Sequence, residues 1–312
     1  MARRLWPRAL ILAYHRVADP ALDPYGQAVS PQRFAEQMAY LRHTYAVDAL
    51  DSLLPRLGRR AYRDRTVVVT FDDGYADNLM VGYPIARRHE VPITLFATVQ
   101  PILDGGRFWW DDLTLCLRAG HASRRVLPLE IAGRPFEIAA HTDRDALQGA
   151  LHAALRGRPR GERERVMDVL RCWAAPKADS LDVGRPLTPS ELREMSRLAG
   201  VTIGAHTMTH PVLRSLPPPE QAEELGASKA ALERLLDLPV TVAAYPFGKP
   251  GDVGPATRGA ARRAGYRAAC TTIPGPIVPA ADRYALPRLT VHDWTVEEFA
   301  RRLRALLGEG PA

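Results

Sequence analysis

Lysine, cysteine and long apolar runs are scarce in this chain of 312 residues. Its three cysteines, Cys116, Cys172 and Cys270, lack the paired spacing of a disulfide framework, so we expect reduced, inert thiols. No apolar run approaches the ~20 residues that a transmembrane helix needs. Residues 1–8 are basic, but the apolar segment after them is too short for a signal peptide. These scarcities predict a cytoplasmic protein and leave attachment to a membrane surface open.

The positive charge comes almost entirely from arginine. Only three of the 42 basic residues are lysines, the other 39 are arginines, and the formal net charge is +7. Clusters at residues 56–65 and 156–165 lack zinc-finger spacing and aromatic RNA-binding motifs, so we expect no nucleic-acid partner. A solvated basic surface explains the charge. The functional alternative is attraction to anionic substrates, such as nucleotide sugars or lipid phosphates, or to a membrane face.

Two adjacent carboxylates follow a short apolar stretch. Residues 66–71 are rich in β-branched side chains and too few for a helix, which predicts a buried strand that ends at Asp72 and Asp73. Burying both carboxylates is costly unless a cation or a dedicated hydrogen-bond partner neutralises one of them. Taken alone, Asp-Asp-Gly could equally be a turn in which an aspartate caps the next helix.

Two histidines follow a second short apolar run, at residues 201–205. His206 and His210 alone would more often be a surface pair or a buried structural residue. Together with one aspartate they make a three-ligand set for a divalent metal that leaves a coordination position open to water. The second aspartate is then available as a base. Because α/β active sites form where strands end at one rim, the two pairs favour a metal-dependent hydrolase.

Strands and helices alternate along most of the chain. Apolar runs predict strands at residues 9–15, 66–71, 92–98, 201–205, 241–245, 267–272 and 284–291. Periodic segments predict helices at residues 31–44, 75–89, 188–198, 218–236, 255–264 and 295–307. Seven strands with intervening helices predict an α/β fold, an incomplete or distorted parallel (β/α)7 barrel.

The motifs resemble those of the polysaccharide deacetylase family, the NodB-homology carbohydrate esterases. Its T-F-D-D-G motif matches residues 70–74, its His-[Ser/Thr]-x-x-His motif matches 206–210, and its Pro-aromatic-Gly motif matches 246–248. The resemblance covers most of residues 9–290. The resemblance implies that Asp72 is the base and that Asp73, His206 and His210 are metal ligands. It also implies that the backbone N–H of Phe247 is an oxyanion donor, and Tyr245 beside it is a candidate substrate contact.

Two departures from the family pattern concern the base and the acid. Ala243 and Ala244 stand where most relatives have an arginine beside the base, and Arg288, a charge in the last apolar strand, is our candidate replacement; a surface-facing arginine explains it equally well. No Leu-x-His motif supplies the general acid near the C-terminus. His15 ends the first strand, as in the exopolysaccharide-type branch of the family, and we expect it, rather than His292, to be the acid because first and last strands of a barrel are neighbours.

Residues 100–187 interrupt the alternation within what we expect to be a single catalytic domain spanning residues 1–312. The interruption predicts an inserted helical subdomain, a lid or a specificity element. It shows helical patterns at 112–119, 143–156 and 161–173 and a hairpin pattern at 125–138. Near its start, Trp110 suits stacking on a sugar ring and Asp111 suits binding a hydroxyl, or the aromatic residues only seat the insertion on the barrel.

The resemblance implies hydrolysis of an N-acetyl group from an amino sugar in a glycan, a lipid-linked sugar or a sugar nucleotide. Zinc is the expected single divalent metal, and Co, Ni, Mn or Fe would accept the same ligands. Removal of a formyl group or cleavage of another C–N bond is an alternative. An alternative of another class is a catalytically silent glycan-binding protein. The intact set of Asp72, Asp73, His206 and His210 argues against it.

Overall fold

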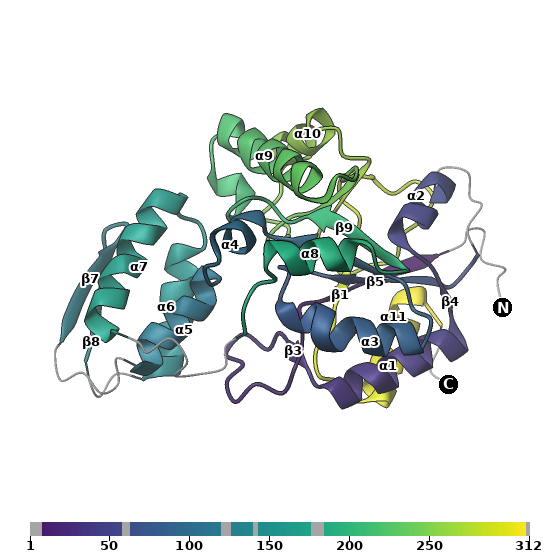
Figure 1. The fold of residues 1–312 in the computed structure, drawn as a ribbon, viewed down its shortest axis with the longest axis horizontal. Helices are drawn as coiled ribbons and strands as arrows, with labels where there is room; N and C mark the ends of the chain where they lie inside the picture. The colour runs from purple at the N-terminus through teal and green to yellow at the C-terminus, as the bar shows by residue number, and fades with distance from the viewer. Residues whose placement is uncertain (1–7, 58–62, 120–125, 140–142, 176–183, 310–312) are drawn as a thin grey trace.

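A curled parallel sheet forms the centre of the molecule (Figure 1). The computed structural model describes residues 8–57, 63–119, 126–139, 143–175 and 184–309. The strand order is β11-β10-β9-β6-β5-β1-β12, and β4 pairs with β5 beside β6. The strands of this sheet are β1 (Ala9–Tyr14), β4 (Ala46–Val47), β5 (Thr66–Phe71), β6 (Ile93–Ala97), β9 (Val201–Ala205), β10 (Val242–Ala244), β11 (Ala268–Cys270) and β12 (Leu289–Thr290). The predicted incomplete (β/α) barrel is confirmed.

The two central strands are continuous apolar runs because helices cover the outer face of the sheet and the inner face packs within its curl, so neither face is left to water. All residues of β1 and β5 are buried. Their register pairs Ala9 with Thr66 and Tyr14 with Phe71. The next residues, His15 and Asp72, therefore leave the sheet side by side.

Helices surround the outer face of the curled sheet, and α2 (Leu50–Leu57) packs against the apolar cluster on its inner face (Figure 1). The other helices of the barrel are α1 (Pro31–Thr44), α3 (Tyr83–Arg88), α8 (Pro189–Ser196), α9 (Pro218–Leu236), α10 (Pro255–Arg263) and α11 (Val296–Leu307). The helix predicted at residues 75–89 begins instead as a π-helical turn, η1 (Asn78–Gly82), before α3. Helix α2 and the short parallel pair β2 (Arg16–Val17) and β3 (Ala28–Val29) were not predicted.

One short segment brings the two ends of the sheet together. Leu289 pairs with Leu12 of β1, while Leu286 makes a parallel bridge with Cys270 of β11. Residues 286–290 thus contact β1 on one side and β11 on the other. The first and last strands of the barrel are therefore neighbours. Arg288 lies in the middle of this segment.

The inserted segment forms a lobe beside the barrel, joined to it through α4 (Figure 1). It contains α4 (Val99–Asp104), α5 (Trp109–Ala119), β7 (Leu127–Ile131), β8 (Arg134–Ile138), α6 (Arg144–Leu155) and α7 (Arg160–Ala174). The hairpin turns at Ala132 and Gly133, whose φ angles of 51° and 74° suit a two-residue turn of the primed type. The lobe has its own apolar cluster, which Tyr75 joins from the barrel.

No helix within the described ranges combines the length and the apolar character needed to cross a membrane.

Candidate metal and catalytic site

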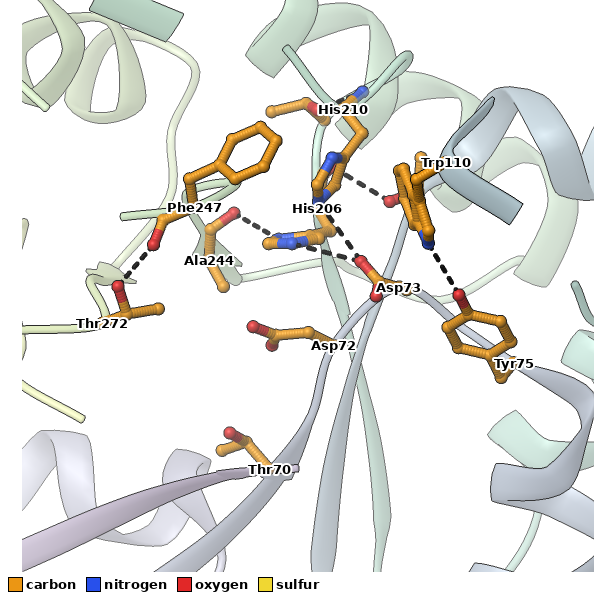
Figure 2. Close-up of polar contacts among 12 residues, drawn as sticks. Thr70, Asp72, Asp73, Tyr75, Trp110, His206, His210, Ala244, Phe247 and Thr272 are labelled. Atoms are coloured by element: carbon orange, nitrogen blue, oxygen red, sulfur yellow. Dashed lines mark hydrogen bonds and ion pairs between the residues drawn. The ribbon is translucent and has the colours of Figure 1, made fainter. Parts of the chain in front are cut away.

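The turn after β5 sends two buried carboxylates in different directions (Figure 2). Asp72 and Asp73 are each 1% exposed. Asp73 has a φ of 71° and Gly74 a φ of 94°, and the N–H of Gly74 donates to the carbonyl of Asp72 at 2.9 Å. This tight left-handed turn separates the two side chains, so they can perform different tasks.

Asp73 meets two imidazoles that follow β9. Its Oδ1 lies 3.6 Å from Nε2 of His206 and 3.3 Å from Nε2 of His210. Four ligands about 2.0–2.1 Å from a tetrahedral zinc ion lie roughly 3.3 Å from one another. The two distances from Asp73 Oδ1 are close to this spacing, and the three ligand atoms all lie within 4.8 Å of one another.

The hydrogen bonds of these side chains also fit a metal. Oδ1 of Asp73 is buried and has no hydrogen-bond partner among the described residues. Nδ1 of His206 donates to the carbonyl of Ala244 at 2.8 Å, which leaves the Nε2 lone pair for an ion. Burial lowers the pKa of both imidazoles, that of His210 to about 3, so both are neutral ligands at pH 7. Asp73, His206 and His210 are thus suited to hold a divalent metal.

Residues from two further helices hold the loop that carries His210. Glu224 of α9 accepts hydrogen bonds from the N–H of Met208 at 2.9 Å and from the N–H and hydroxyl of Thr209 at 3.0 and 2.6 Å. Nη2 of Arg163, from α7 of the insertion, donates to the carbonyl of Thr209 at 2.8 Å. The loop needs such support because His210 has a φ of 58°, in the left-handed region.

The structure brings Arg288 to Asp72. Its Nη1 and Nη2 donate to Oδ1 and Oδ2 of Asp72, both at 2.7 Å, and its Nε donates to the carbonyl of Thr271 at 2.9 Å. The guanidinium is fully buried. Burial alone would raise the pKa of Asp72, but Arg288 outweighs it and holds that pKa far below its ordinary value. Arg288, the residue before β12, is therefore the buried arginine partner of Asp72.

Asp72, His206 and His210 line one pocket of ≈ 320 Å³, together with His15. Nδ1 of His15 is buried without a hydrogen-bond partner in the described ranges, and the His15 carbonyl accepts from Asn78 at 2.8 Å. His292 also lines this pocket, but it is exposed and its Nδ1 donates to the carbonyl of Gly26 at 2.7 Å. Besides the metal-ligand pair, the pocket lining contains two imidazoles from the barrel: His15, which follows the first strand, and His292, which follows the last.

Phe247 offers a backbone donor at the pocket edge. Its φ is 60°, its carbonyl accepts from the hydroxyl of Thr272, and its N–H has no hydrogen-bond partner within the described part of the chain. Its ring lines the pocket. A free N–H at this place is suited to stabilise a developing oxyanion.

The remaining candidates from the sequence have different positions. Trp110 lines the pocket, stacks on Phe108 with centroids 4.8 Å apart and donates from Nε1 to the hydroxyl of Tyr75 at 2.7 Å. Asp111 does not line the pocket; it accepts from that same hydroxyl at 2.8 Å, and burial raises its pKa well above the ordinary value. Tyr245 also points away from the pocket, into the core, where its hydroxyl donates to the carbonyl of Tyr284 at 3.0 Å.

The insertion supplies pocket residues that the sequence analysis did not identify. His152 and Arg156 of the α6 region line the pocket, and the His152 ring stacks on Trp109 with centroids 5.0 Å apart. Burial and the neighbouring Arg156 lower the pKa of His152 to about 4, so its ring is neutral. Gln148, His152 and Arg156 recur every four residues, and this polar stripe on a predicted helix was the available signal.

Comparisons with known proteins agree with this geometry. The family model for polysaccharide deacetylase matches residues 59–144 and 164–269. YxkH of Bacillus subtilis (strain 168), described as a polysaccharide deacetylase, is 32% identical over 105 residues, which are 34% of this chain and only 36% of that protein. The matched segment thus spans about a third of this relative.

Solved structures share the fold. The Streptococcus pyogenes deacetylase PplD, in complex with acetate, has a TM-score of 0.62 and 18% identity, over 95% of this chain and 98% of its own. IcaB from Ammonifex degensii has a TM-score of 0.63 and 18% identity, over 97% and 98% of the two chains. The family model covers more than half of this chain of 312 residues. Its match includes the two motifs at residues 70–74 and 206–210. The chain belongs to the polysaccharide deacetylase family.

Proposed function

We propose that the protein is a metal-dependent hydrolase that removes the N-acetyl group from an amino sugar. The observation that carries the proposal is the difference in environment between Asp72, which lines the pocket, and Asp73, which lies beside the two histidines that line it. Asp72 is held by Arg288, whereas Asp73 faces two neutral imidazoles. Adjacent carboxylates with such different partners are typical of a site in which one is a base and the other a ligand.

Each residue has a role in that reaction. Asp73, His206 and His210 would hold a divalent ion, which when bound would supply Lewis-acid activation of the acyl oxygen and of water. Asp72 accepts the proton of the attacking water, since a carboxylate oxygen retains a lone pair beside its bond to Arg288.

The other half of the reaction needs an oxyanion donor and an acid. The N–H of Phe247 stabilises the negative charge that develops on the acyl oxygen. His15, in its imidazolium form, gives a proton to the departing amine as the C–N bond breaks, so that acetate and a free amino sugar are released.

The insertion, residues 100–187, acts in this proposal as a specificity subdomain of a single catalytic domain. Its support is that Trp110, His152 and Arg156 form one side of the pocket. The substrate is an N-acetylated sugar in a glycan, a lipid-linked sugar or a sugar nucleotide. The exposed Lys249 at the pocket suits an anionic substrate, whereas Arg156 is already paired with Asp252 at 2.6 Å. The scarcity of cysteine supports a cytoplasmic site of action.

Product analysis tests the proposal. The zinc- or cobalt-loaded protein is incubated with N-acetylglucosamine oligomers, lipid-linked N-acetyl sugars and sugar nucleotides, and acetate and formate are measured separately. We expect acetate with an equal amount of free amine, and none from protein treated with a chelator. Formate from N-formyl sugars without acetate from this panel would favour the deformylase alternative.

A further inference from the structure

A second cavity lies directly behind the wall of the catalytic pocket, between α4 and α7. Its volume is ≈ 160 Å³, and its lining includes Trp109, Arg163 and Thr209. The residues next to these in the chain, Trp110 and His210, line the catalytic pocket. The two spaces are therefore separated by little more than the Trp109–Trp110 pair and the loop that carries His210.

Two side chains that line this second cavity carry buried donors without acceptors. Arg163 is 2% exposed, and only its Nη2 has a partner, the carbonyl of Thr209 at 2.8 Å. Its Nε and Nη1 and the Nε1 of Trp109 are buried without a hydrogen-bond partner in the part of the chain that the structure describes. A buried donor left unpaired costs about 1–3 kcal/mol, and more when the group is charged. Three such donors at one cavity indicate an acceptor in it.

The charge at the cavity is compatible with an anionic acceptor. Burial lowers the pKa of Arg163 to about 10, so its guanidinium remains charged at neutral pH. Further arginines in the lining are Arg107, Arg160 and Arg171.

Two carboxylates also line the cavity, and both have partners other than Arg163. Glu164 accepts from Arg171 at 3.3 Å, and Asp104 accepts from Gln100 at 2.9 Å. The charges of Glu164 and Glu224 raise the pKa of Arg163, but among the described residues neither carboxylate forms a hydrogen bond or ion pair with it. Its direct contacts are the Trp109 ring, 5.1 Å away, and a backbone carbonyl.

We propose that this cavity binds a small oxyanion, a phosphate, sulfate or carboxylate group, through Nε and Nη1 of Arg163 and Nε1 of Trp109. Planar guanidinium groups bind such anions through paired, charge-assisted hydrogen bonds. The bound anion fixes Arg163, whose remaining N–H holds Thr209, the residue before the metal-ligand candidate His210. An anion bound outside the catalytic pocket would thus act, through Arg163 and Thr209, on the loop that carries His210.

Calorimetric titration of the metal-loaded protein with inorganic phosphate, at constant ionic strength, tests the site. Arg163→Gln should weaken binding at least about tenfold, because it removes charge-assisted hydrogen bonds. Arg165→Gln is the matched control: it removes the same charge two residues along α7, from an exposed side chain outside the cavity lining. We expect it to change the affinity less than about twofold.

Trp109→Phe is the second variant, informative even where Arg163→Gln fails to fold. It keeps the ring that packs on His152 and removes one donor, so it should weaken phosphate binding several-fold. A crystal structure with phosphate should place the anion beside Arg163. Equal phosphate affinity in wild type, Arg163→Gln and Trp109→Phe, or a cavity holding water alone at saturating phosphate, would overturn the proposal.

A third titration identifies the source of the anion. N-acetylglucosamine 1-phosphate carries the same group on a sugar. Competition with inorganic phosphate at the Arg163 site, with tighter binding of the sugar phosphate, supports an anionic glycan. Binding of inorganic phosphate alone supports a free anion.

Discussion

The contact between Asp72 and Arg288 is the residue-level feature on which the catalytic proposal depends most. Both side chains are buried, and Arg288 donates two hydrogen bonds of 2.7 Å to Asp72. Removing one partner of a buried ion pair lowers the stability of the fold by more than the intact pair raises it, because the other charge is left buried without a partner. The pair therefore acts as one unit in both stability and catalysis.

Arg288→Met should lower the free energy of unfolding by about 3–5 kcal/mol at pH 7, because it leaves Asp72 buried without its partner. In the wild type the pKa of Asp72 is lower in the folded than in the unfolded state. The pair accordingly contributes stability above the unfolded pKa of ~3.9, and this contribution is lost as the pH falls further.

Urea denaturation of wild type and variant at several pH values measures this effect. The difference between the two proteins should be largest at neutral pH and should shrink toward pH 3. Arg301→Met, at an exposed arginine of α11, is the control and should cost less than about 1 kcal/mol. An Arg288→Met protein as stable as this control would show that the ion pair does not form.

His15 and His292 both line the pocket, and substitution distinguishes their roles. His15→Ala should lower kcat for amide substrates by ~10²–10⁴ and leave metal content unchanged, since it removes the proposed acid. An activated ester, whose leaving group needs no proton, should suffer much less. His292→Ala should have a smaller effect, because its exposed ring is bonded to the carbonyl of Gly26. The reverse pattern in steady-state kinetics would assign the acid to His292.

At the scale of elements, the site depends on helices that contact the ligand loop from two sides. Glu224 of α9 holds Met208 and Thr209 through three hydrogen bonds, and Arg163 of α7 holds Thr209 through one. Helix α7 belongs to the insertion, so the lobe and the barrel meet at this loop. Metal affinity should therefore depend on residues that are not ligands.

Glu224→Ala should weaken zinc binding by about tenfold or more while the fold is retained, because the loop no longer holds His210 in its left-handed conformation. Competition with a fluorescent chelator measures the affinity. Glu223→Ala, at the exposed neighbouring position of the same helix, is the matched control. Equal zinc affinities in the two variants would remove Glu224 from the account.

The sequence was informative where a pattern has one physical explanation. The apolar runs of β1, β5, β6 and β9 are too short for helices and too apolar for exposed strands, so their places were predictable. Helix α2 was missed because it is short and contains Pro55. The π-helical start at Asn78 could not be read from a pattern that also suits an α-helix.

Side-chain direction was less predictable than position. Tyr245 and Asp111 lie in segments next to the site, but their hydroxyl and carboxylate bond to Tyr284 and Tyr75 instead of facing the pocket. Those partners are distant in the chain, and no local pattern identifies them. Arg288 was a candidate because it is a charge inside an apolar run, but the sequence left a surface-facing arginine equally open.

At the scale of the whole molecule, the proposed metal connects strands that are far apart in sequence. Asp73 follows β5, whereas His206 and His210 follow β9, on the other side of β6 in the sheet. An ion that binds the folded chain and not the unfolded one stabilises it by mass action. Zinc at 100 times its dissociation constant should therefore add about 2.7 kcal/mol to the free energy of unfolding.

Thermal unfolding with and without a chelator measures this stabilisation. Removal of zinc should lower the Tm of the wild type and leave the Tm of a His206→Ala, His210→Ala double variant unchanged. An equal response of both proteins would place the stabilising ion elsewhere.

Titration of the metal-free protein with zinc, while acetate release from an N-acetylated amino sugar is followed, tests whether the protein is a zinc-dependent deacetylase. We predict that the rate rises with added zinc and saturates at about one ion per chain. Asp72→Asn should bind the same amount of zinc without turnover, and the double histidine variant should show neither. Undiminished acetate release after complete removal of metal, or full zinc occupancy in the double histidine variant, would contradict the account.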